Sequence, residues 1–578
     1  MIACNRILFL DNKESIRQSF RERLVSRGYE VYTAATPEEA DAILACTRIQ
    51  IAIIDVRLSN EDKDEADRGG MEYVRTLQPP VVPLLLSAWR TDELMHEAVF
   101  DNPDGTLPIE EFLNKNDEIK TTLDRIDRVF TKKVLSQINH APDLFEWRRR
   151  FELKQLIQPF LHDSNCDEGR LMEEVEELLR RLCLTETKVK LYPMEFGRGG
   201  GAIVFARPVY PQTNGQTNGE PFVIKLGWVE DIQLEIDKYK KYVLPYASHN
   251  STTFRTDEVR RTAWLMGFKM SFVGATSEKP RDLNSVFIDH HVPDSALKEL
   301  IGRVFKSTSA RWYENKKPWG QGVLGVEVNE NDSYRPMAAD LAIGFDAASE
   351  LAVSVRALLD GQSYHHVRFT AQGAERIRVT IDGTEQELPN PLAMLRARPG
   401  RLPPPSFWAI THGDLNGKNV LVDGNLTPWL IDFTRTGWGA VLRDVAELES
   451  AVVFELIHKI PPSVSLTDLL TFQKAILSPA QFADGIELPV ALQVKPFTRA
   501  LTAVQTLRDV ATDIIETKRI GEYYVLLFYY ALKMVTWKGI TSFDEDMSDV
   551  RRRHALYAAL LLCAKLDTGP APAREVIV

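Results

Sequence analysis

Cysteine is scarce in this sequence, and its arrangement excludes two kinds of site. Five cysteines are dispersed over 578 residues, and no two of them form a Cys-x-x-Cys pair. Disulfide frameworks and zinc sites both require paired or closely spaced cysteines. We therefore expect neither, and the scattered thiols indicate a reducing compartment.

Long apolar runs are also missing. The two longest, residues 523–532 and 555–564, fall well short of the ~18–20 residues that a membrane-spanning helix requires. The first apolar run, residues 6–10, leads directly into Asp11 and lacks the form of a signal peptide. We expect no membrane insertion and a cytoplasmic location.

Positive charge is not in excess. The formal net charge is -11 and the pI is about 5.6, whereas a nucleic-acid-binding surface needs clustered basic residues. The short basic run 148–150 lies in a helical pattern and is interpreted as a solvated helix face. No nucleic-acid partner is expected. The length of 578 residues suggests about three structural units.

The first 130 residues alternate short apolar runs with helical patterns. Strands that alternate with helices in this way form a parallel sheet covered on both faces, and its central strands are continuously apolar. The expected strands are 6–10, 30–34, 49–55, 81–87 and 111–113, and the expected helices are 15–27, 37–45 and 70–77.

Polar side chains stand at the carboxyl ends of these expected strands. They are Asp11, Asp55, Ser87 and, shortly after the last strand, Lys115. Ligands of such sheets gather at the carboxyl ends of the strands, so the four groups are expected to share one pocket. A carboxylate that accepts a phosphoryl group needs a divalent cation, which Asp11, Asp55 and the backbone carbonyl of Arg57 would hold.

These residues resemble the pocket of two-component receiver domains, which have a flavodoxin-like five-stranded parallel sheet. The resemblance covers residues 1–130 and implies that Asp55 is the phospho-acceptor and that Asp11 and Asp55 bind Mg²⁺. It implies a receiver pocket of Asp11, Asn12, Ser87 and Lys115, and a histidine kinase or phosphotransfer protein as partner. The sequence departs from the family at Asn12, which replaces a second acid, at Asn116, which replaces a proline, and in an acidic insertion at 61–67.

Two alternatives to a working receiver stay open at this point. One is a flavodoxin-like domain in which carboxylates stand at strand ends by chance. The other is a receiver-shaped domain that never accepts phosphate.

A second set of chemical residues lies late in the chain, in the run Thr-His-Gly-Asp-Leu-Asn-Gly-Lys-Asn of residues 411–419. Phosphoryl transfer to a hydroxyl needs a base near the acceptor and oxygen ligands for magnesium. Asp414 is the candidate base, and Asn419 and Asp432 are the candidate metal ligands. His412 is expected to support the loop, and Asp444 to brace it through backbone amides.

An upstream segment supplies candidates for nucleotide binding. The glycine cluster Gly197, Gly199, Gly200 and Gly201 lies between apolar strands and would let backbone amides approach a triphosphate. The strand 222–225 ends in Lys225, which can pair with the α- and β-phosphates. Glu235 is the candidate ion-pair partner of Lys225, with Glu230 and Asp231 as competitors.

The order of glycine loop, lysine, glutamate, His-Gly-Asp, Asn and Asp resembles the protein-kinase-like superfamily. It is most similar to the aminoglycoside and choline phosphotransferase branch and to the "ternary complex associated" domains. The resemblance covers residues 186–570 and implies an α+β two-lobed domain that uses ATP and Mg²⁺, with catalytic residues Asp414 and Lys225. Its N-lobe would span about 186–250 and its C-lobe about 251–570, after a helical connector at 131–185.

Together these patterns predict a cytoplasmic bacterial signalling protein with a receiver, a connector and a kinase-like output. The phosphate acceptor of the output is not readable from the sequence. A non-catalytic, nucleotide-binding pseudokinase scaffold controlled by the receiver remains the alternative.

Overall fold

The computed structural model divides the chain into two compact units. Unit 1 comprises residues 1–233 and 253–271, and unit 2 comprises residues 234–252 and 272–578. The residues described below are 5–59, 67–88, 109–148, 152–161, 168–194, 201–212, 215–246, 253–254, 258–271, 280–319, 334–344, 346–360, 363–397, 402–461, 463–537 and 545–567.

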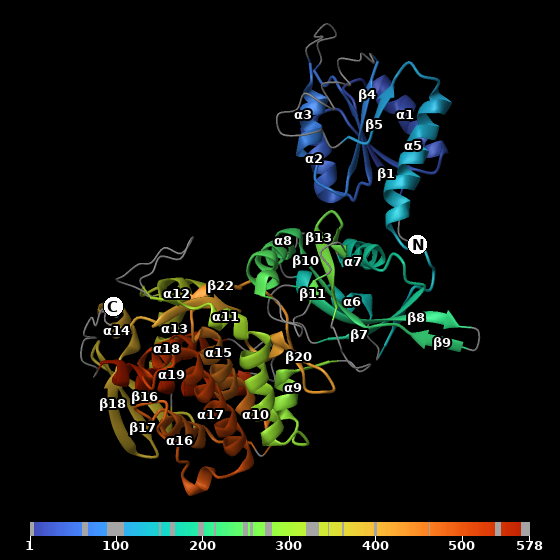
Figure 1. The fold of residues 1–578 in the computed structure, drawn as a ribbon. Coiled ribbons are helices and arrows are strands. Elements are labelled where there is room, and N and C mark those ends of the chain that lie inside the picture. The colour runs from blue at the N-terminus through green and yellow to red at the C-terminus, as the bar shows by residue number, and fades with distance from the viewer. Residues whose placement is uncertain are drawn as a thin grey trace. The chain divides into compact units, whose positions relative to one another are not determined.

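Unit 1 begins with a five-stranded parallel sheet in the order β2-β1-β3-β4-β5 (Figure 1). This strand order is that of flavodoxin-like folds, including receivers. The strands are β1 (Arg6–Leu10), β2 (Glu30–Ala34), β3 (Ile51–Asp55), β4 (Val82–Ser87) and β5 (Glu111–Asn114), and the helices are α1 (Glu14–Ser26), α2 (Pro37–Cys46), α3 (Gly69–Thr76) and α5 (Ile119–Val129).

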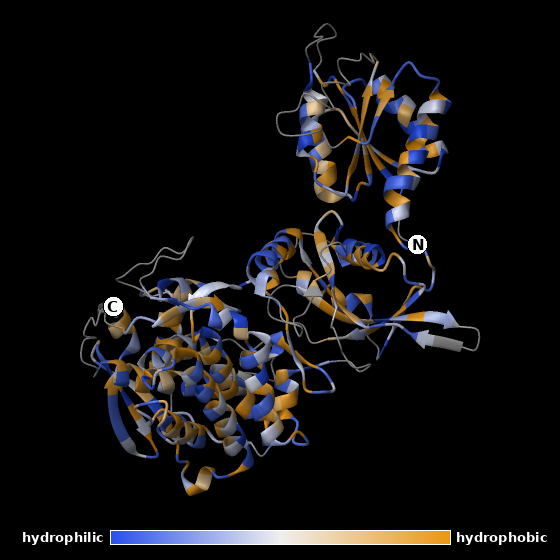
Figure 2. Cartoon of the chain, in the orientation of Figure 1, coloured by the Kyte–Doolittle hydropathy of each residue, from blue (hydrophilic) through white to orange (hydrophobic). Residues whose placement is uncertain are grey.

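Alternate side chains of these strands enter two cores, one on each face of the sheet. Ile53 and Leu84 belong to the core that α1 and α5 cover, and Ile54 and Leu85 belong to the core with α3. The central strands β1, β3 and β4 are therefore largely apolar, as Figure 2 shows, and the sequence prediction of this sheet is confirmed. Pro83 stands in interior strand β4 next to Ala52 of β3, close to the beginning of the strand.

The rest of unit 1 is built around a mainly antiparallel sheet. Its strands follow the order β11-β13-β10-β8-β7-β6, with β12 paired to β13 and β9 paired to β8. β8 and β9 pair in antiparallel fashion from Val209 and Asn218 to Gln212 and Gly215, within the tandem Gln-Thr-Asn-Gly sequence of residues 212–219. The strands are β6 (Phe145–Trp147), β7 (Lys188–Pro193), β8 (Ala202–Gln212), β9 (Gly215–Asn218), β10 (Phe222–Trp228), β11 (Thr253–Phe254), β12 (Arg260–Arg261) and β13 (Leu265–Ser271).

The segment expected to be a helical connector differs from that prediction. It contains β6, which pairs in parallel with β7 and so belongs to the second sheet. Its helices α6 (Leu153–Leu156) and α7 (Glu168–Leu182) place apolar side chains in the core of that sheet. The sheet also extends past the lobe boundary expected near residue 250, because β13 pairs with β10 along its whole length.

The described part of unit 2 is largely helical and contains three small three-stranded sheets. Its strands are β14 (Arg281–Asp282), β15 (Lys317–Pro318), β16 (Val367–Gln372), β17 (Arg376–Ile381), β18 (Thr384–Pro389), β19 (Phe407–Thr411), β20 (Val420–Val422), β21 (Pro428–Leu430) and β22 (Gly437–Ala440). Its helices are α9 (Leu283–Ile288), α10 (Asp294–Arg303), α11 (Ala310–Glu314), α12 (Arg335–Asp340), α13 (Glu350–Asp360), α14 (Pro391–Ala397), α15 (Arg443–Ala451), α16 (Leu466–Ile476), α17 (Lys495–Ile515), α18 (Gly521–Val535) and α19 (Glu545–Asp567); α8 (Val229–Lys238) begins in unit 1 and ends in unit 2.

The helices of unit 2 pack around a buried polar centre as well as an apolar core. Glu449 of α15 pairs with Arg508 of α17 and accepts a hydrogen bond from the hydroxyl of Tyr523 on α18. No helix among the described residues is long and apolar enough to cross a membrane.

Candidate functional site

The first candidate site lies at the carboxyl ends of the receiver strands. The ammonium of Lys115 lies 2.6 Å from Asp11 Oδ2 and 2.9 Å from Asp55 Oδ2, and both carboxylates are almost fully buried. Ser87, also buried, ends the neighbouring strand β4, and its carbonyl accepts the backbone N–H of Lys115. The structure therefore brings together the four residues that the strand-end pattern predicted.

Burial makes the carboxyl of Asp55 a weaker acid. Removal from water raises the pKa of its carboxyl to about 6, with the nearby negative charge of Asp11 adding to the rise. The positive charge of Lys115 opposes the rise in pKa but does not cancel it. The pocket thus holds two acids and one cation, and additional positive charge would stabilise the ionised form of Asp55.

The donor set of this pocket fits a hard divalent cation. The amide nitrogen of Asn12 donates to the carbonyl of Ser59, whereas its amide oxygen is buried without a hydrogen-bond partner. A buried oxygen left in this way on the residue that follows Asp11 would suit a magnesium ligand. Asn12, the departure from the receiver pattern, would therefore offer an oxygen ligand without the negative charge of a second acid.

Gly70 is a residue of this site that the sequence patterns did not reveal. A Cβ atom at this position would lie 1.9 Å from the carbonyl oxygen of Asp55, so only glycine fits there. Its N–H donates to the carbonyl of Val56, which fixes the start of α3 against the end of β3. The signal that could have identified it is the Gly-Gly pair that opens the predicted helix.

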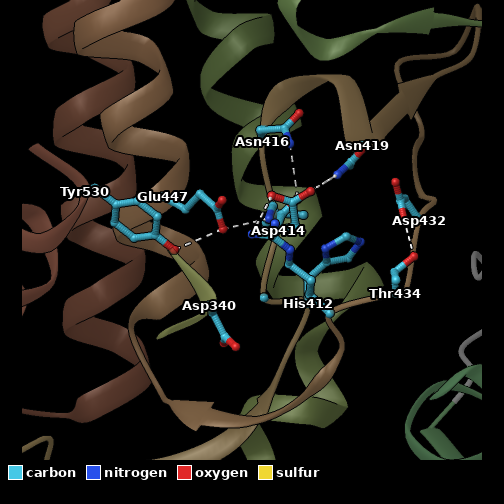
Figure 3. A network of polar contacts seen from close by, with 12 residues as sticks. Asp340, His412, Asp414, Asn416, Asn419, Asp432, Thr434, Glu447 and Tyr530 are labelled. Atoms are coloured by element: carbon cyan, nitrogen blue, oxygen red, sulfur yellow. Dashed lines mark hydrogen bonds and ion pairs between the residues drawn. The ribbon is translucent and has the colours of Figure 1, made fainter. Parts of the chain in front are cut away.

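The second candidate site lies in unit 2, in the loop between β19 and β20 (Figure 3). The side-chain amide of Asn419 donates to the backbone carbonyl of Asp414 at 2.7 Å and to Asp414 Oδ2 at 3.2 Å. Its amide nitrogen is thereby fixed, and its amide oxygen is the atom that a cation would bind. The Asp414 side chain keeps about a third of its surface exposed, as a group that acts on an external hydroxyl requires.

Buried contacts hold this loop in place. The two oxygens of Asp444 accept the backbone N–H groups of His412, at 2.8 Å, and Gly413, at 2.9 Å. The hydroxyl of Tyr313 donates to the same carboxylate. The prediction that Asp444 braces the loop through its amides is confirmed. His412 is fully buried with Nε2 3.0 Å from the carbonyl of Ile431, which fits a supporting role rather than proton transfer.

Asp432 follows β21 in an unusual backbone conformation. Its φ is +68°, in the left-handed region that non-glycine residues seldom adopt, and such strain is often found at functional sites. The hydroxyl of Thr434 donates to Asp432 Oδ1 at 2.7 Å. The next residue, Phe433, donates its N–H to Glu235 Oε1. Glu235 thus contacts the loop that carries Asp432, and its pairing with Lys225 stays a prediction.

Two of the expected nucleotide-binding residues of unit 1, Lys225 and Gly201, lie among the described residues. Lys225 is buried in β10, between Ile203 of β8 and Phe268 of β13. Gly201 lies against it: a Cβ there would be 2.8 Å from the carbonyl of Leu226 and 3.7 Å from Lys225 Cε. The other candidate glycines, Gly197, Gly199 and Gly200, lie outside the described residues.

The sequence patterns did not identify three further residues around the loop, Asp340, Arg443 and Glu447. Arg443 donates to the Gly413 carbonyl and to Asp340, and Glu447 accepts the N–H of Leu415. Glu447 lies three residues after Asp444, so one helical turn separates the two acids. This spacing is a signal that could have suggested Glu447 as a second brace.

The family comparison concerns unit 2. The model of the family described as ternary complex associated domain 9 matches residues 341–535, a range that contains Asp414, Asn419, Asp432 and Asp444. No curated protein matches the chain.

The solved structures that match are similar to the N-terminal region. A CheY-like receiver domain protein from Methanospirillum hungatei is 21% identical, covering 22% of this chain and 95% of that chain, with a TM-score of 0.19. The response regulator TrrA from Thermotoga maritima, in complex with Mg²⁺ and BeF, is 20% identical, covering 22% and 98%, with a TM-score of 0.18. The chemotaxis protein CheY4 from Vibrio cholerae is 27% identical, covering 22% and 99%, with a TM-score of 0.18.

The N-terminal region resembles a CheY-like receiver domain. The likeness rests on the strand order β2-β1-β3-β4-β5 and on the cluster of Asp11, Asp55 and Lys115 at the strand ends, and not on the low TM-scores.

Proposed function

We propose that the chain is a response-regulator-type signalling protein, phosphorylated on Asp55, with an ATP- and Mg²⁺-dependent phosphotransferase as its output. The observation that carries the proposal is the cluster of Asp11, Asp55 and Lys115 at the strand ends. The loop of Asp414 and Asn419, with its amides fixed by Asp444, supports the second half.

At the receiver, a histidine kinase or phosphotransfer protein would be the phosphoryl donor. An oxygen of Asp55 attacks the phosphorus, the bond from phosphorus to the donor nitrogen breaks, and the nitrogen takes up a proton. Asp11 and Asp55 would hold Mg²⁺, which would supply positive charge to the transferring group. Lys115 then pairs with one phosphoryl oxygen, and the Ser87 hydroxyl donates a hydrogen bond to another.

At the output, Asp414 would orient the acceptor hydroxyl and take up its proton as that oxygen bonds to the γ-phosphorus of ATP. The bond from the γ-phosphorus to the bridging oxygen breaks at the same time, and ADP leaves. Asn419 and Asp432 offer the oxygen ligands that Mg²⁺ prefers. The resemblance assigns Lys225 to the nucleotide phosphates, a role that stays a prediction.

Contacts within unit 1 offer a route from the receiver to the second sheet. Arg48, between α2 and β3, is 2% exposed and pairs with Glu177 and, at 3.7 Å, with Glu174 of α7. Apolar side chains on another face of α7 pack into the core of the sheet that carries Lys225. A rearrangement of the phosphorylated receiver would therefore act on α7.

The test is ATP turnover by the full chain with and without beryllofluoride, an aspartyl-phosphate analogue, in the presence of Mg²⁺. Beryllofluoride is expected to change the rate in the wild type and not in Asp55→Asn. Arg48→Gln is expected to bind beryllofluoride without transmitting the change. Unaltered turnover in the wild type would contradict receiver control, and absent turnover under all conditions would contradict the enzyme.

A non-catalytic nucleotide-binding scaffold is the second candidate. Thr434 stands where the kinase-like family has glycine, and its hydroxyl donates to Asp432 Oδ1. This bond competes with a cation for one of the two carboxylate oxygens. A scaffold would bind MgATP without turning it over.

A further inference from the structure

Glu447 is a buried acid at the base of the loop that carries Asp414. It projects from α15 and is 8% exposed. Its Oε2 accepts the backbone N–H of Leu415 at 2.9 Å and the hydroxyl of Tyr530 at 3.1 Å (Figure 3). One carboxyl oxygen thus joins the loop, α15 and α18, and Leu415 is the residue that directly follows Asp414.

The charges around Glu447 favour its uncharged form. Burial is the first cause that raises the pKa of this carboxyl, to about 8, and the negative charges of Asp414 and Asp444 add to the rise. Arg443 and the Tyr530 hydroxyl oppose it.

Arg443, the cation that opposes the rise in the pKa of Glu447, forms its hydrogen bonds with other groups. Arg443 donates to Asp340 at 2.7 Å and to the carbonyl of Gly413 at 2.9 Å. Among the described contacts, none is an ion pair between Arg443 and Glu447. The buried acid is therefore surrounded by two carboxylates and by a guanidinium whose hydrogen bonds go to other groups.

We propose that Glu447 and Tyr530 are positioning residues of the output site, and that Glu447 acts as the uncharged acid. Uncharged Glu447 fixes Leu415, and through it the position of Asp414, without placing a second negative charge next to the base. This inference rests on the proposed phosphotransferase function. Deprotonation of Glu447 in alkaline solution would repel Asp414 and loosen the loop.

Glutamine reproduces an uncharged carboxyl, and this makes the inference testable. Glu447→Gln keeps an oxygen that accepts from Leu415 and Tyr530, but it cannot ionise. ATP turnover of the full chain is measured between about pH 6 and pH 9.5, a range that spans the titration of Glu447. Glu447→Gln is expected to match the wild type near neutral pH and to lack its alkaline decline.

Removing the contact should reduce turnover without reducing nucleotide affinity. Glu447→Ala is expected to lower kcat by ~10²-fold, the loss typical of a misplaced catalytic group, while the Kd for MgATP stays within a few-fold of the wild type. A purely structural role would instead lower the fraction of folded protein and leave the pH profile of the remaining activity unchanged.

The matched control is a second tyrosine on the same helix. Tyr523 of α18 also donates to a glutamate of α15, Glu449, and no described hydrogen bond joins this pair to the loop. Tyr523→Phe and Tyr530→Phe each remove one buried hydrogen bond, so both are expected to lose stability. Only Tyr530→Phe is expected to alter the pH profile of turnover.

Amide hydrogen exchange at Leu415 separates failure of the inference from failure of the proposed function. The amide is expected to be protected in the wild type and in Glu447→Gln, and exposed in Glu447→Ala. An active wild type whose pH profile Glu447→Gln leaves unchanged would overturn the inference alone. An inactive wild type overturns the phosphotransferase, and equal exchange in all three proteins overturns the contact itself.

Discussion

Lys115, directly after β5, lies 2.9 Å from Asp55 at the end of β3, and the same ammonium reaches Asp11 at 2.6 Å. The positive charge of Lys115 opposes the rise in the pKa of the buried Asp55 carboxyl. A phosphoryl group on Asp55 would offer this lysine new oxygens to pair with, so its contacts are expected to depend on the state of the pocket.

The first prediction concerns the phospho-acceptor. Acetyl phosphate with Mg²⁺ is expected to modify the wild type and to spare Asp55→Asn, because Asp55 ends the central strand β3 and lies 2.9 Å from Lys115. Asp41→Asn is the matched control, since Asp41 is a receiver acid that accepts a hydrogen bond from Tyr73. Intact mass spectrometry detects the adduct. Equal modification of Asp55→Asn would refute the assignment.

The second prediction concerns stability and pH. The folded pKa of Asp55, about 6, lies above its ordinary value, so the folded receiver holds this proton more tightly than the unfolded chain. Its contribution to stability is therefore complete below about pH 4 and is lost as the pH rises to about 6. In EDTA, the melting temperature of Asp55→Asn is expected to rise above that of the wild type as the pH increases from about 4 to about 6. Added Mg²⁺ should reduce that gain at neutral pH.

The third prediction concerns nucleotide binding. Lys225→Ala is expected to weaken ATP binding while the fold survives, and Asp432→Ala is expected to abolish the magnesium dependence of binding. Thermal stabilisation by MgATP reports both, because a ligand that binds the folded state raises the melting temperature, and it raises it more the more tightly it binds. Unchanged stabilisation in both variants would place the nucleotide site elsewhere.

The sequence predicted the receiver better than the surroundings of the output loop. Buried parallel strands are continuous apolar runs, so all five were found to within two residues and their ends gave Asp11, Asp55 and Ser87. The β6 strand is short and pairs in parallel with β7, across the whole of α7, which no local pattern reveals. Tyr530 is 83 residues from Glu447, and an isolated tyrosine in an apolar helix carries no signal for a distant acid.

The fourth prediction concerns the turn of the output loop. Gly413 has a φ of +78°, and a Cβ there would lie 2.5 Å from the carbonyl oxygen of Arg435. Gly413→Ala is expected to abolish turnover, because the loop must move to relieve the overlap. Gly383→Ala is the matched control, since Gly383 has a φ of +81° with no atom within 4 Å of the added Cβ. It is expected to cost only the ~1–2 kcal/mol of a left-handed alanine and to keep its activity.

The last prediction distinguishes the base from the metal ligand. A residue that acts only on the acceptor hydroxyl stabilises the transition state and contributes little to nucleotide affinity. Asp414→Asn is therefore expected to lower turnover by ~10²–10⁴-fold while the Kd for MgATP stays within a few-fold of the wild type.

A metal ligand behaves differently, because the cation bridges protein and phosphates in the ground state as well. Asp432→Asn is expected to lose affinity and turnover together, and raised Mg²⁺ should restore part of both. Nucleotide titration and ATP hydrolysis of the two variants decide the matter. If the wild type and Asp414→Asn bind MgATP equally and neither turns it over, the output is a nucleotide-sensing scaffold. In that case Asp414 does not act as a base, and the contacts of Asn419 and Asp444 serve only to hold the loop in place.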